Sequence, residues 1–419
     1  MRGLYTVLLR LSLPLILLKL WRRGRREPGY CQALGERFGR YSPSGPAASS
    51  AAPVFWVHAV SVGEARAAAP LVRALQAARP DHRVLVTCTT AAGRETVRQV
   101  FGDSVICAWL PYDYPGAVRR FLERFKPRLG VLMETEIWPN LLAACRQRGV
   151  PVLLANARMS ERSARGYARW GALARPALAA MSRILAQSEA DAERLRGLGA
   201  PRVEVAGNLK FDAAFDAGHD AALVEAGKLW RAKLGRPVLL LASTREGEEE
   251  RLLGALPAWD GRLLVLVVPR HPQRFDEVAA LAQSRRTRSA EPAPEDRVHL
   301  GDTMGEMAFY YGACDVAVIG GSFEPLGGQN LIEALAAGAP VVTGPHMFNF
   351  AEAARLAVEA GAALSAPDAA AAVRAALDLM ADPARRQRMA AAGRALCERH
   401  RGATARHVAA CLQLIEAPG

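Results

Sequence analysis

The chain has 419 residues, which is more than one hydrophobic core usually serves, so two domains are expected. Its hydrophobic content of 51% and charged content of 23% are typical of globular proteins and exclude an intrinsically disordered chain. The net charge of +13 is concentrated at one end, since residues 1–45 hold nine Arg and Lys but only two Glu. This distribution argues against a nucleic-acid-binding surface spread over the fold and favours contact with an anionic membrane face.

The first predicted element is an apolar segment from Leu4 to Trp21, rich in Leu and interrupted by Arg10 and Lys19. A basic cluster follows directly at residues 22–26. This order differs from that of a cleavable signal peptide, and about 18 residues with an internal Arg are marginal for spanning a bilayer. We predict that residues 1–26 form a membrane anchor helix with a basic collar, either interfacial or barely spanning, which keeps the rest of the chain cytoplasmic. A buried amphipathic helix is the alternative.

Residues 27–53 are expected to connect this segment to the first domain, and Pro43–Pro53 has the composition of a linker. From Val54 onward, nearly all-apolar runs alternate with helical stretches, which indicates doubly wound parallel sheets. The polar segment Asp212–Asp220 breaks this pattern before it restarts. The sequence therefore predicts an α/β fold with two Rossmann-like domains, residues 54–215 and 216–419, facing each other across a cleft. The tail from Ala384 to Ile415 is expected to form one or two helices that close the second domain. The predicted strands are Val54–His58, Val84–Thr87, Val105–Trp109, Leu129–Met133, Val150–Ala155, Ile184–Gln187, Val203–Ala206, Val238–Ala242, Leu263–Val268, Val316–Ile319 and Val341–Thr343.

The seven cysteines are scattered and include no Cys-x-x-Cys pair, as in proteins of a reducing compartment. The eight histidines show no spacing typical of metal ligands. No metal site and no cofactor is therefore predicted.

The most informative segment begins where the apolar run Asp315–Ile319 ends on Gly320, Gly321 and Ser322. These three residues are candidates for a phosphate-binding loop. A second glycine pair then precedes a helix that is expected to begin near Gln329, with Asn330 and Glu333 in its first turn. A helix N-terminus presents free N–H groups that suit a phosphate, and a carboxylate one turn in suits ribose hydroxyls. An ordinary turn between strand and helix is the alternative.

Polar motifs at the predicted strand ends resemble, in order, those of the 3-deoxy-D-manno-octulosonic acid (Kdo) transferases, which have the GT-B glycosyltransferase fold. The resemblance extends over nearly the whole chain, from the apolar segment to about Leu412. The motifs that carry it are His58-Ala-Val-Ser-Val-Gly-Glu64, Leu110-Pro-Tyr-Asp113, Met133-Glu-Thr-Glu-Ile-Trp-Pro-Asn140, Asn156-Ala-Arg-Met-Ser160, Gly207-Asn-Leu-Lys-Phe-Asp212, Pro269-Arg-His-Pro272, Gly301–Glu306 and Gly320–Glu333.

The resemblance implies roles for individual residues. Glu64 matches the general base, and Glu134 and Lys210 match the groups that stabilise the transition state. Glu134 is also expected to orient either Lys210 or the acceptor, and Glu136 is easily confused with it. The residues that match the CMP-Kdo site are Pro269, Arg270, Met304, Gly305, Glu306, Asn330, Leu331, Ile332 and Glu333.

The resemblance also implies a reaction, in which Kdo moves from CMP-Kdo to a lipid A precursor with inversion and without a metal. Such an enzyme would lie on the cytoplasmic side of the inner membrane of a Gram-negative bacterium. Gln329 and Arg245 stand where many members have His, which affects substrate tuning more than reaction type. A GT-B enzyme with a uridine or guanine sugar nucleotide, and a catalytically inactive nucleotide sensor, are the alternatives. The number of Kdo units added and the oligomeric state stay open.

Overall fold

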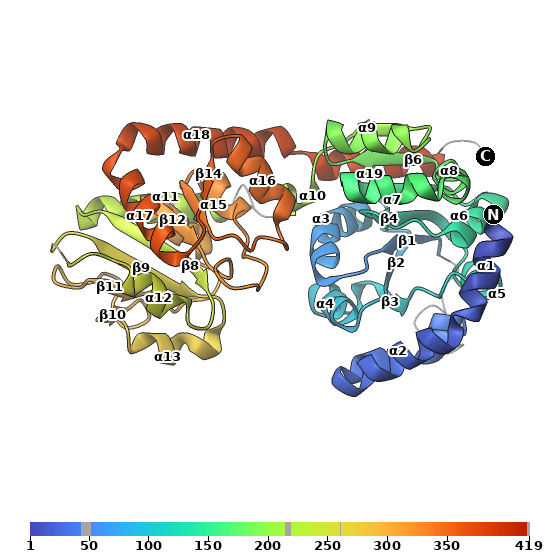
Figure 1. Cartoon of the computed structure of the whole chain (residues 1–419), viewed down its shortest axis with the longest axis horizontal. Helices are drawn as coiled ribbons and strands as arrows, with labels where there is room; N and C mark the ends of the chain where they lie inside the picture. The colour runs from blue at the N-terminus through green and yellow to red at the C-terminus, as the bar shows by residue number, and fades with distance from the viewer. Residues whose placement is uncertain (43–51, 214–218, 260, 417–419) are drawn as a thin grey trace. The chain divides into compact units, whose positions relative to one another are not determined.

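The protein was analysed as a computed structural model, which describes residues 1–42, 52–213, 219–259 and 261–416. It divides into two compact domains (Figure 1). The N-terminal domain comprises Met1–Ala213 and His400–Gly419, and the C-terminal domain comprises Ala214–Arg399. The division after Ala213 lies close to the predicted division after residue 215. The predicted linker Pro43–Pro53 and the polar break Asp212–Asp220 lie largely outside the described residues. The cleft between the domains stays a prediction.

A parallel seven-stranded sheet forms the centre of the N-terminal domain. Its strands are β1 (Val54–His58), β2 (Arg83–Cys88), β3 (Ile106–Trp109), β4 (Pro127–Met133), β5 (Val152–Ala157), β6 (Arg183–Ala186) and β7 (Val203–Val205). They follow the order β3-β2-β1-β4-β5-β6-β7, so the chain builds outward from β1 in both directions, as in doubly wound sheets. The helices that connect them are α3 (Val62–Ala78), α4 (Ala91–Phe101), α5 (Pro115–Phe125), α6 (Pro139–Gln147), α7 (Glu161–Arg169), α8 (Gly171–Leu178) and α9 (Glu189–Gly197), and α10 (Leu209–Ala213) follows β7.

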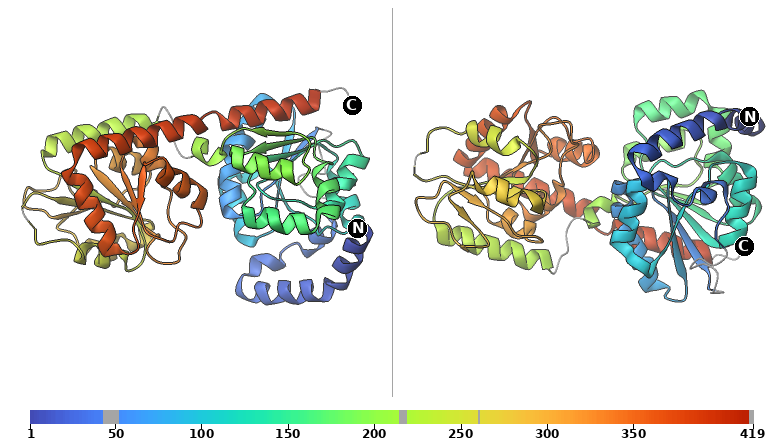
Figure 2. Two further views of the ribbon diagram at one scale, coloured as in Figure 1. Left: turned by 45° about the horizontal axis from the view of Figure 1, so that its top comes forward. Right: turned by 90° about the horizontal axis from the view of Figure 1, so that it is seen from below.

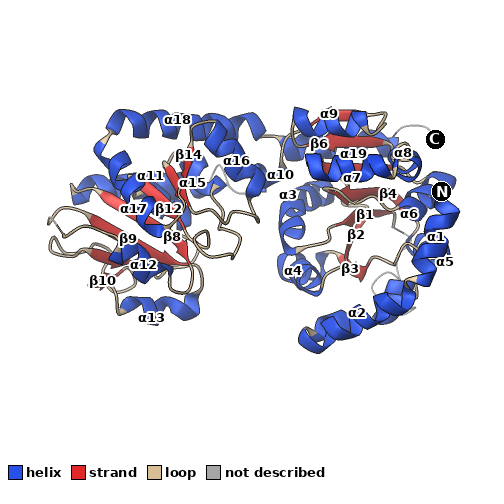
Figure 3. Cartoon of the chain, in the orientation of Figure 1, coloured by secondary structure: helices blue, strands red, loops and turns tan. Residues whose placement is uncertain are grey.

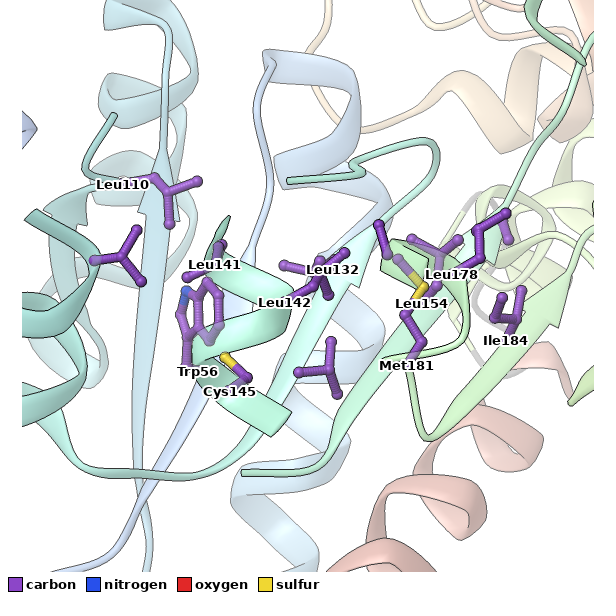
Figure 4. Close-up of a cluster of buried hydrophobic side chains, with 14 of the residues drawn as sticks. Trp56, Leu110, Leu132, Leu141, Leu142, Cys145, Leu154, Leu178, Met181 and Ile184 are labelled. Carbon is purple, nitrogen blue, oxygen red and sulfur yellow. The ribbon is translucent and has the colours of Figure 1, made fainter. Parts of the chain in front are cut away.

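Helices cover both faces of this sheet, which explains why its strands are apolar on both sides (Figure 3). All five residues of β1 are buried. On one face, Trp56 of β1 packs with Leu141 and Cys145 of α6, and Leu154 of β5 extends the same cluster (Figure 4). The central strands therefore run through a continuous core and present their ends at a sheet edge.

The C-terminal domain has a second parallel seven-stranded sheet, in the order β10-β11-β9-β8-β12-β13-β14. Its strands are β8 (Val238–Thr244), β9 (Leu264–Pro269), β10 (Ser284–Arg285), β11 (Val298–Leu300), β12 (Val316–Ile319), β13 (Val341–Thr343) and β14 (Ala363–Ser365). Its helices are α11 (His219–Leu234), α12 (Glu248–Gly254), α13 (Phe275–Ala279), α14 (Met307–Gly312), α15 (Ile332–Ala337), α16 (Ala351–Glu359), α17 (Ala369–Ala381) and α18 (Pro383–His400). The prediction of two α/β domains with parallel sheets is confirmed.

The C-terminal tail forms two helices, and the second does not close the domain to which it was assigned. Gly402, with φ +78°, separates α18 from α19 (Ala403–Glu416). Ala410 and Cys411 of α19 belong to the core of the N-terminal domain, where the helix packs against α3. The assignment of 216–419 to one domain is therefore wrong for residues 400–419, because the apolar face of α19 is buried in the other core.

The apolar N-terminal segment consists of two helices, α1 (Arg2–Leu11) and α2 (Leu13–Arg26), where one was predicted (Figure 2). No single helix in the described ranges is long and apolar enough to cross a bilayer, but α1 and α2, bent by 53°, meet this criterion as a pair by length and composition. The predicted connecting segment is also partly structured, since it forms the short helices η1 (Pro28–Cys31) and η2 (Leu34–Phe38). Glu36 of η2 accepts a hydrogen bond from the Trp109 backbone N–H at 2.9 Å, so this segment belongs to the N-terminal domain.

Candidate active site

Glu64 lies at the edge of the N-terminal sheet, in the first turn of α3 and six residues after the end of β1. Ser61 caps this helix: its Oγ accepts the Glu64 N–H at 3.3 Å and donates to Glu64 Oε1 at 3.0 Å. The Val60 N–H donates to Glu64 Oε2 at 2.9 Å. This reciprocal capping holds the carboxylate in one orientation at the carboxyl end of β1.

The pKa of Glu64 is raised from its usual 4.5 to about 7, mainly by burial and in addition by the charges of Glu134 and Glu136. The hydrogen bonds from Val60 and Ser61 act in the opposite direction, because they favour the charged carboxylate. Near neutral pH this carboxyl group is present in both protonation states. A general base with such a pKa can accept a proton and release it again.

Glu134 and Lys210, the other two predicted catalytic residues, form an ion pair at the same edge. Lys210 Nζ lies 3.3 Å from Glu134 Oε1, and each side chain is about a fifth exposed, at 23% and 20%. Glu136 instead accepts a hydrogen bond from Trp138 Nε1 at 2.7 Å and lies 3.8 Å from His58 Nε2. The contact with Lys210 therefore distinguishes Glu134 from Glu136.

Backbone strain is found at three strand ends, two in the N-terminal domain and one in the C-terminal domain. Five described non-glycine residues have positive φ values, and three of them, Glu134, Asn156 and Ser243, have values of 58°, 52° and 54°. They lie at the carboxyl ends of β4, β5 and β8. Such residues cost about 1–3 kcal/mol each and persist where the surrounding structure holds them.

A network of buried amides holds the turn that carries Lys210. Asn156 Oδ1 accepts the Leu209 N–H at 3.0 Å, and the Asn156 carbonyl accepts a hydrogen bond from Gln187 Nε2 at 2.9 Å. Asn208 donates to Gln187 Oε1 at 2.9 Å, and its own Oδ1 accepts the Lys210 N–H at 2.9 Å. The role of Asn156, which was open from the sequence, is thus to position this turn.

His407 connects α19 to the same network. Its Nε2 accepts the Asn156 backbone N–H at 2.9 Å, and its Nδ1 lies 2.7 Å from the Ala403 carbonyl, to which it donates. Burial lowers the pKa of His407 to about 4, so the ring is neutral with its proton on Nδ1. Sequence reasoning missed this residue, because it follows no motif and lies 251 positions from its partner.

In the C-terminal domain, β9 ends at Pro269, one residue later than predicted, and Arg270 follows it. The Arg270 backbone N–H donates to the Thr244 carbonyl at 3.0 Å, and its side-chain Nε donates to Gln329 Oε1 at 3.1 Å. Gln329 therefore orients this guanidinium beside the loop that follows β12.

The predicted phosphate-binding loop at Gly320, Gly321 and Ser322 has several of its polar groups bonded within the domain. The Gly320 N–H donates to the Ala242 carbonyl at 2.8 Å, and the Gly321 N–H donates to Glu248 Oε2 at 2.7 Å. Ser322 Oγ donates to the Ile319 carbonyl at 2.6 Å and accepts the Gly344 N–H at 2.7 Å. These groups already have hydrogen-bond partners within the domain, and the phosphate-binding role of the loop stays a prediction.

Asn330 and Glu333 were predicted in the first turn of a helix that begins near Gln329, but α15 begins at Ile332, so only Glu333 lies in its first turn. Asn330 Oδ1 accepts the Ile332 N–H at 3.0 Å, and its Nδ2 donates to Glu333 at 2.8 Å. Burial raises the pKa of Glu333 to about 7, and the Asn330 hydrogen bond and the Arg270 charge partly oppose this. Leu331 and Ile332 have buried side chains, so only their backbone can reach a ligand.

The Met304–Glu306 segment forms a separate exposed loop. The Met304 side chain is 64% exposed, and Gly305 has φ +81°. Arg286 donates two hydrogen bonds to Glu306, at 2.9 and 3.1 Å, and lowers the pKa of that carboxyl group. Thr303 Oγ1 donates to the same carboxylate at 2.5 Å. Glu306 therefore holds the loop, which leaves the Met304 side chain and the backbone to contact a ligand.

Buried carboxylates that the sequence did not single out support this edge. Glu248 accepts the Arg245 and Phe323 N–H groups at 2.9 and 3.2 Å, in addition to that of Gly321. Glu249 pairs with Arg274 through two hydrogen bonds of 2.7 and 3.0 Å. Both residues lie in the first turn of α12, so this helix joins the loops after β8, β9 and β12. The described part of the chain holds no group of three or more His, Cys, Asp or Glu placed to bind a metal ion.

Comparison with known proteins decides the family. Residues 32–213 match the model described as 3-deoxy-D-manno-octulosonic-acid transferase (kdotransferase), and residues 284–396 match glycosyl transferases group 1. The chain is 52% identical to a 3-deoxy-D-manno-octulosonic acid transferase of Bordetella pertussis, over 97% of each chain. The chain belongs to the Kdo transferase family. It is also 38% identical to the protein of the same name from Haemophilus influenzae, over 97% of this chain and 96% of that one.

A solved structure agrees with the architecture of this Kdo transferase family member. A UDP-GlcNAc 2-epimerase from Neisseria meningitidis bound to UDP-GlcNAc aligns with a TM-score of 0.55, over 86% of this chain and 99% of that one. The sequence identity is 18%, so the likeness concerns the fold alone. The family resemblance noted from the sequence motifs is confirmed by the comparisons with the curated relatives.

Proposed function

We propose that this protein transfers Kdo from CMP-Kdo to a lipid A precursor, lipid IVA, with inversion at the anomeric carbon and Glu64 as the general base. The observation that carries the proposal is the environment of Glu64 within a Kdo transferase family member. Its carboxyl group has a pKa of about 7 and lies beside the Glu134–Lys210 pair.

The reaction is a single displacement. An acceptor hydroxyl loses its proton to the Glu64 carboxylate while its oxygen forms a bond to the anomeric carbon of Kdo. The bond from that carbon to the phosphate oxygen breaks, and CMP leaves with the electron pair. One displacement inverts the centre and needs one base but no protein nucleophile.

Lys210 supplies the positive charge for a reaction in which CMP departs as an anion. Its ammonium is 3.3 Å from Glu134, and the amide network fixes its backbone. A charge held in place before the reaction stabilises a developing anion without the cost of reorganisation. Glu134 has two effects here, since it orients Lys210 and its charge raises the pKa of Glu64.

The donor contacts are proposed for the C-terminal domain. Arg270 is suited to a phosphate, because guanidinium groups bind phosphate oxygens in a forked geometry. The Asn330–Glu333 pair is suited to ribose hydroxyls, and the Met304–Glu306 loop offers backbone groups to the base. No cofactor is required for this chemistry.

The acceptor is a lipid, and α1 and α2 support an attachment to the cytoplasmic face of the inner membrane. Hydrogen bonds from Tyr114 Oη to the Leu9 carbonyl and from Asn140 Nδ2 to Thr6 Oγ1, both 3.0 Å, hold α1 on the N-terminal domain. Apolar side chains flanked by basic residues favour the interface of an anionic membrane. The exposed large apolar residues of the two helices are Leu4, Val7, Leu8, Leu11, Leu15, Leu17, Leu18 and Trp21.

The reaction is tested by mass spectrometry of a tetra-acylated lipid A precursor incubated with CMP-Kdo and the detergent-purified full chain. A mass gain of one or more Kdo units is expected and counts the additions, and NMR of the product gives the anomeric configuration. Glu64→Gln should give little product. No mass gain while CMP-Kdo stays intact would refute the proposed donor and acceptor, and equal turnover by Glu64→Gln would refute the proposed base.

Membrane attachment is tested by flotation with vesicles that contain anionic lipid. The double variant Leu11→Asp and Leu15→Asp should no longer float with the vesicles, because both side chains are strongly exposed, at 72% and 69%. Leu229→Asp on α11 is the matched control, since Leu229 is also 72% exposed. Flotation of the double variant at the wild-type level would remove the case for an anchor.

A further inference from the structure

Two arginines and a histidine gather at the carboxyl ends of β8 and β9. Arg245 follows β8, and Arg270 and His271 follow β9. Gly321 separates Arg245 from Gln329: a Cβ added there would lie 3.5 Å from Arg245 Cγ and 2.9 Å from Gln329 Nε2. Because Gln329 also accepts a hydrogen bond from Arg270 at 3.1 Å, both arginines lie next to the same short stretch of backbone.

The charges of these groups act on one another. The pKa of His271 is lowered by burial first, and then by the positive charges of Arg245 and Arg270. Glu246 acts in the opposite direction but does not cancel the effect. The two guanidinium groups therefore disfavour a further positive charge on the imidazole.

Two of the nearby carboxylates are bonded to other groups, and the third forms only an exposed ion pair with Arg245. Glu248 accepts hydrogen bonds from backbone N–H groups. Glu249 accepts hydrogen bonds from Arg274 and, at 2.6 Å, from the Thr244 hydroxyl. Arg245 Nε pairs at 2.9 Å with Glu246, whose side chain is 58% exposed. An ion pair exposed to this degree contributes little, so another carboxylate can replace Glu246 at Arg245 at small cost.

The donor of the proposed function carries two anionic groups, a phosphodiester and the carboxylate of the sugar. We propose that Arg245 binds this sugar carboxylate while Arg270, oriented by Gln329, binds the phosphate. The inference rests on the proposed function and adds a residue that selects a donor by its acid group. Arginine suits this task because its planar fork matches a carboxylate with two parallel hydrogen bonds.

Equilibrium binding of CMP and CMP-Kdo to the full chain, without acceptor, tests the proposal, because CMP lacks the sugar carboxylate. Arg245→Gln should weaken CMP-Kdo binding by about tenfold or more, as loss of a charge-assisted hydrogen bond does, and leave CMP binding within about twofold. Arg270→Gln should weaken both ligands. Arg245→Lys, which keeps the charge, should recover part of the loss.

Arg251→Gln is the matched control, because it removes an exposed guanidinium of α12 that pairs with Glu324. It should leave both affinities unchanged. Equal weakening of CMP and CMP-Kdo by Arg245→Gln, or no effect on either, would overturn the proposal while the proposed donor stands. Failure of the wild-type protein to bind CMP and CMP-Kdo would overturn the proposed donor itself, and the proposal with it.

Discussion

Glu64→Gln is expected to lower turnover without disrupting the fold. The amide keeps an oxygen to accept the Val60 N–H and keeps contact with Ser61, so the capping geometry should survive. It removes the buried charge and the ability to accept a proton. We therefore expect turnover to fall by roughly 10²–10⁴-fold, which is the usual contribution of a general base.

The same substitution should stabilise the N-terminal domain at alkaline pH. The pKa of Glu64 is raised in the folded state, from 4.5 to about 7, so the folded protein binds this proton more tightly than the unfolded chain. The resulting stability is fully present below about pH 4.5 and is lost as the pH rises through about 7, up to about 3 kcal/mol. The Gln variant has no such titration, so its free energy of unfolding should be higher than that of the wild type above about pH 7.

Two measurements check this reasoning. In thermal unfolding, Glu64→Gln should have a higher Tm than the wild type at about pH 8.5, and this difference should shrink towards about pH 5. The wild-type rate should rise with pH through about 7, and Glu134→Gln should move this limb to lower pH, because it removes a charge that raises the pKa of Glu64. Glu161→Gln, at a side chain that is 74% exposed, is the control and should change neither. A stability difference that is the same at both pH values, or a rate that does not change between them, would refute the assignment.

Three further predictions concern Lys210, the network that positions it, and the buried ion pair of the C-terminal domain. Lys210→Met should lower kcat by roughly 10²–10³-fold, as loss of a preorganised charge does, with the Kd for CMP unchanged; equal losses in rate and CMP binding would make it a nucleotide contact. His407→Phe leaves a buried N–H without its acceptor and should cost about 1–3 kcal/mol in denaturant unfolding and lower kcat, and His407→Gln, which can still accept, should recover both; an unchanged kcat for the Phe variant would contradict a positioning role. Arg274→Met leaves the buried Glu249 carboxylate unpaired and should destabilise the C-terminal domain by about 3–5 kcal/mol, against at most about 1 kcal/mol for the exposed Arg251→Met; similar losses in the two variants would contradict this account.

The strands were largely predictable because burial on both faces leaves a strong sequence pattern. β1, β12 and β13 have the predicted bounds, since each begins with a run of apolar residues and is followed by turn residues. The two-residue β10 and the three-residue β11 and β14 were missed. Strands this short are held by their neighbours in the sheet and leave little periodicity to detect.

Helix boundaries failed where backbone bonds outside the helix compete for the N–H groups. The predicted start near Gln329 ignored the bonds from the Gly328 and Gln329 N–H groups to the carbonyls of Gly321 and Gly320, at 2.7 and 3.1 Å. These bonds fold the segment back on the loop after β12 and delay α15 to Ile332. Tertiary pairing of this kind has no local signal in the sequence.

Some residues of the candidate site could also be predicted from the sequence, and others could not. The motifs identified Glu64, Glu134 and Lys210, because strand ends of a parallel sheet collect functional side chains. They did not identify His407, because α19 was assigned to the wrong domain and its contact with Asn156 depends on how the tail folds back. Motifs therefore pointed to the groups proposed to act on a ligand, whereas the groups that hold them required the structure.

The surroundings of the glutamates separate these two kinds of residue. Glu64 and Glu333 each lie in the first turn of a helix that follows a parallel strand, and burial raises the pKa of each to about 7. A first-turn position alone would favour the charged form of each carboxyl group. The raised pKa values therefore reflect burial that is not offset by a salt bridge to Lys or Arg among the described residues. Glu249 and Glu306 are bonded by arginines through two hydrogen bonds each. A carboxylate that is already paired has little capacity left for a substrate, so the two partly protonated glutamates, one in each domain, are the ones best suited to exchange protons or hydrogen bonds with a ligand.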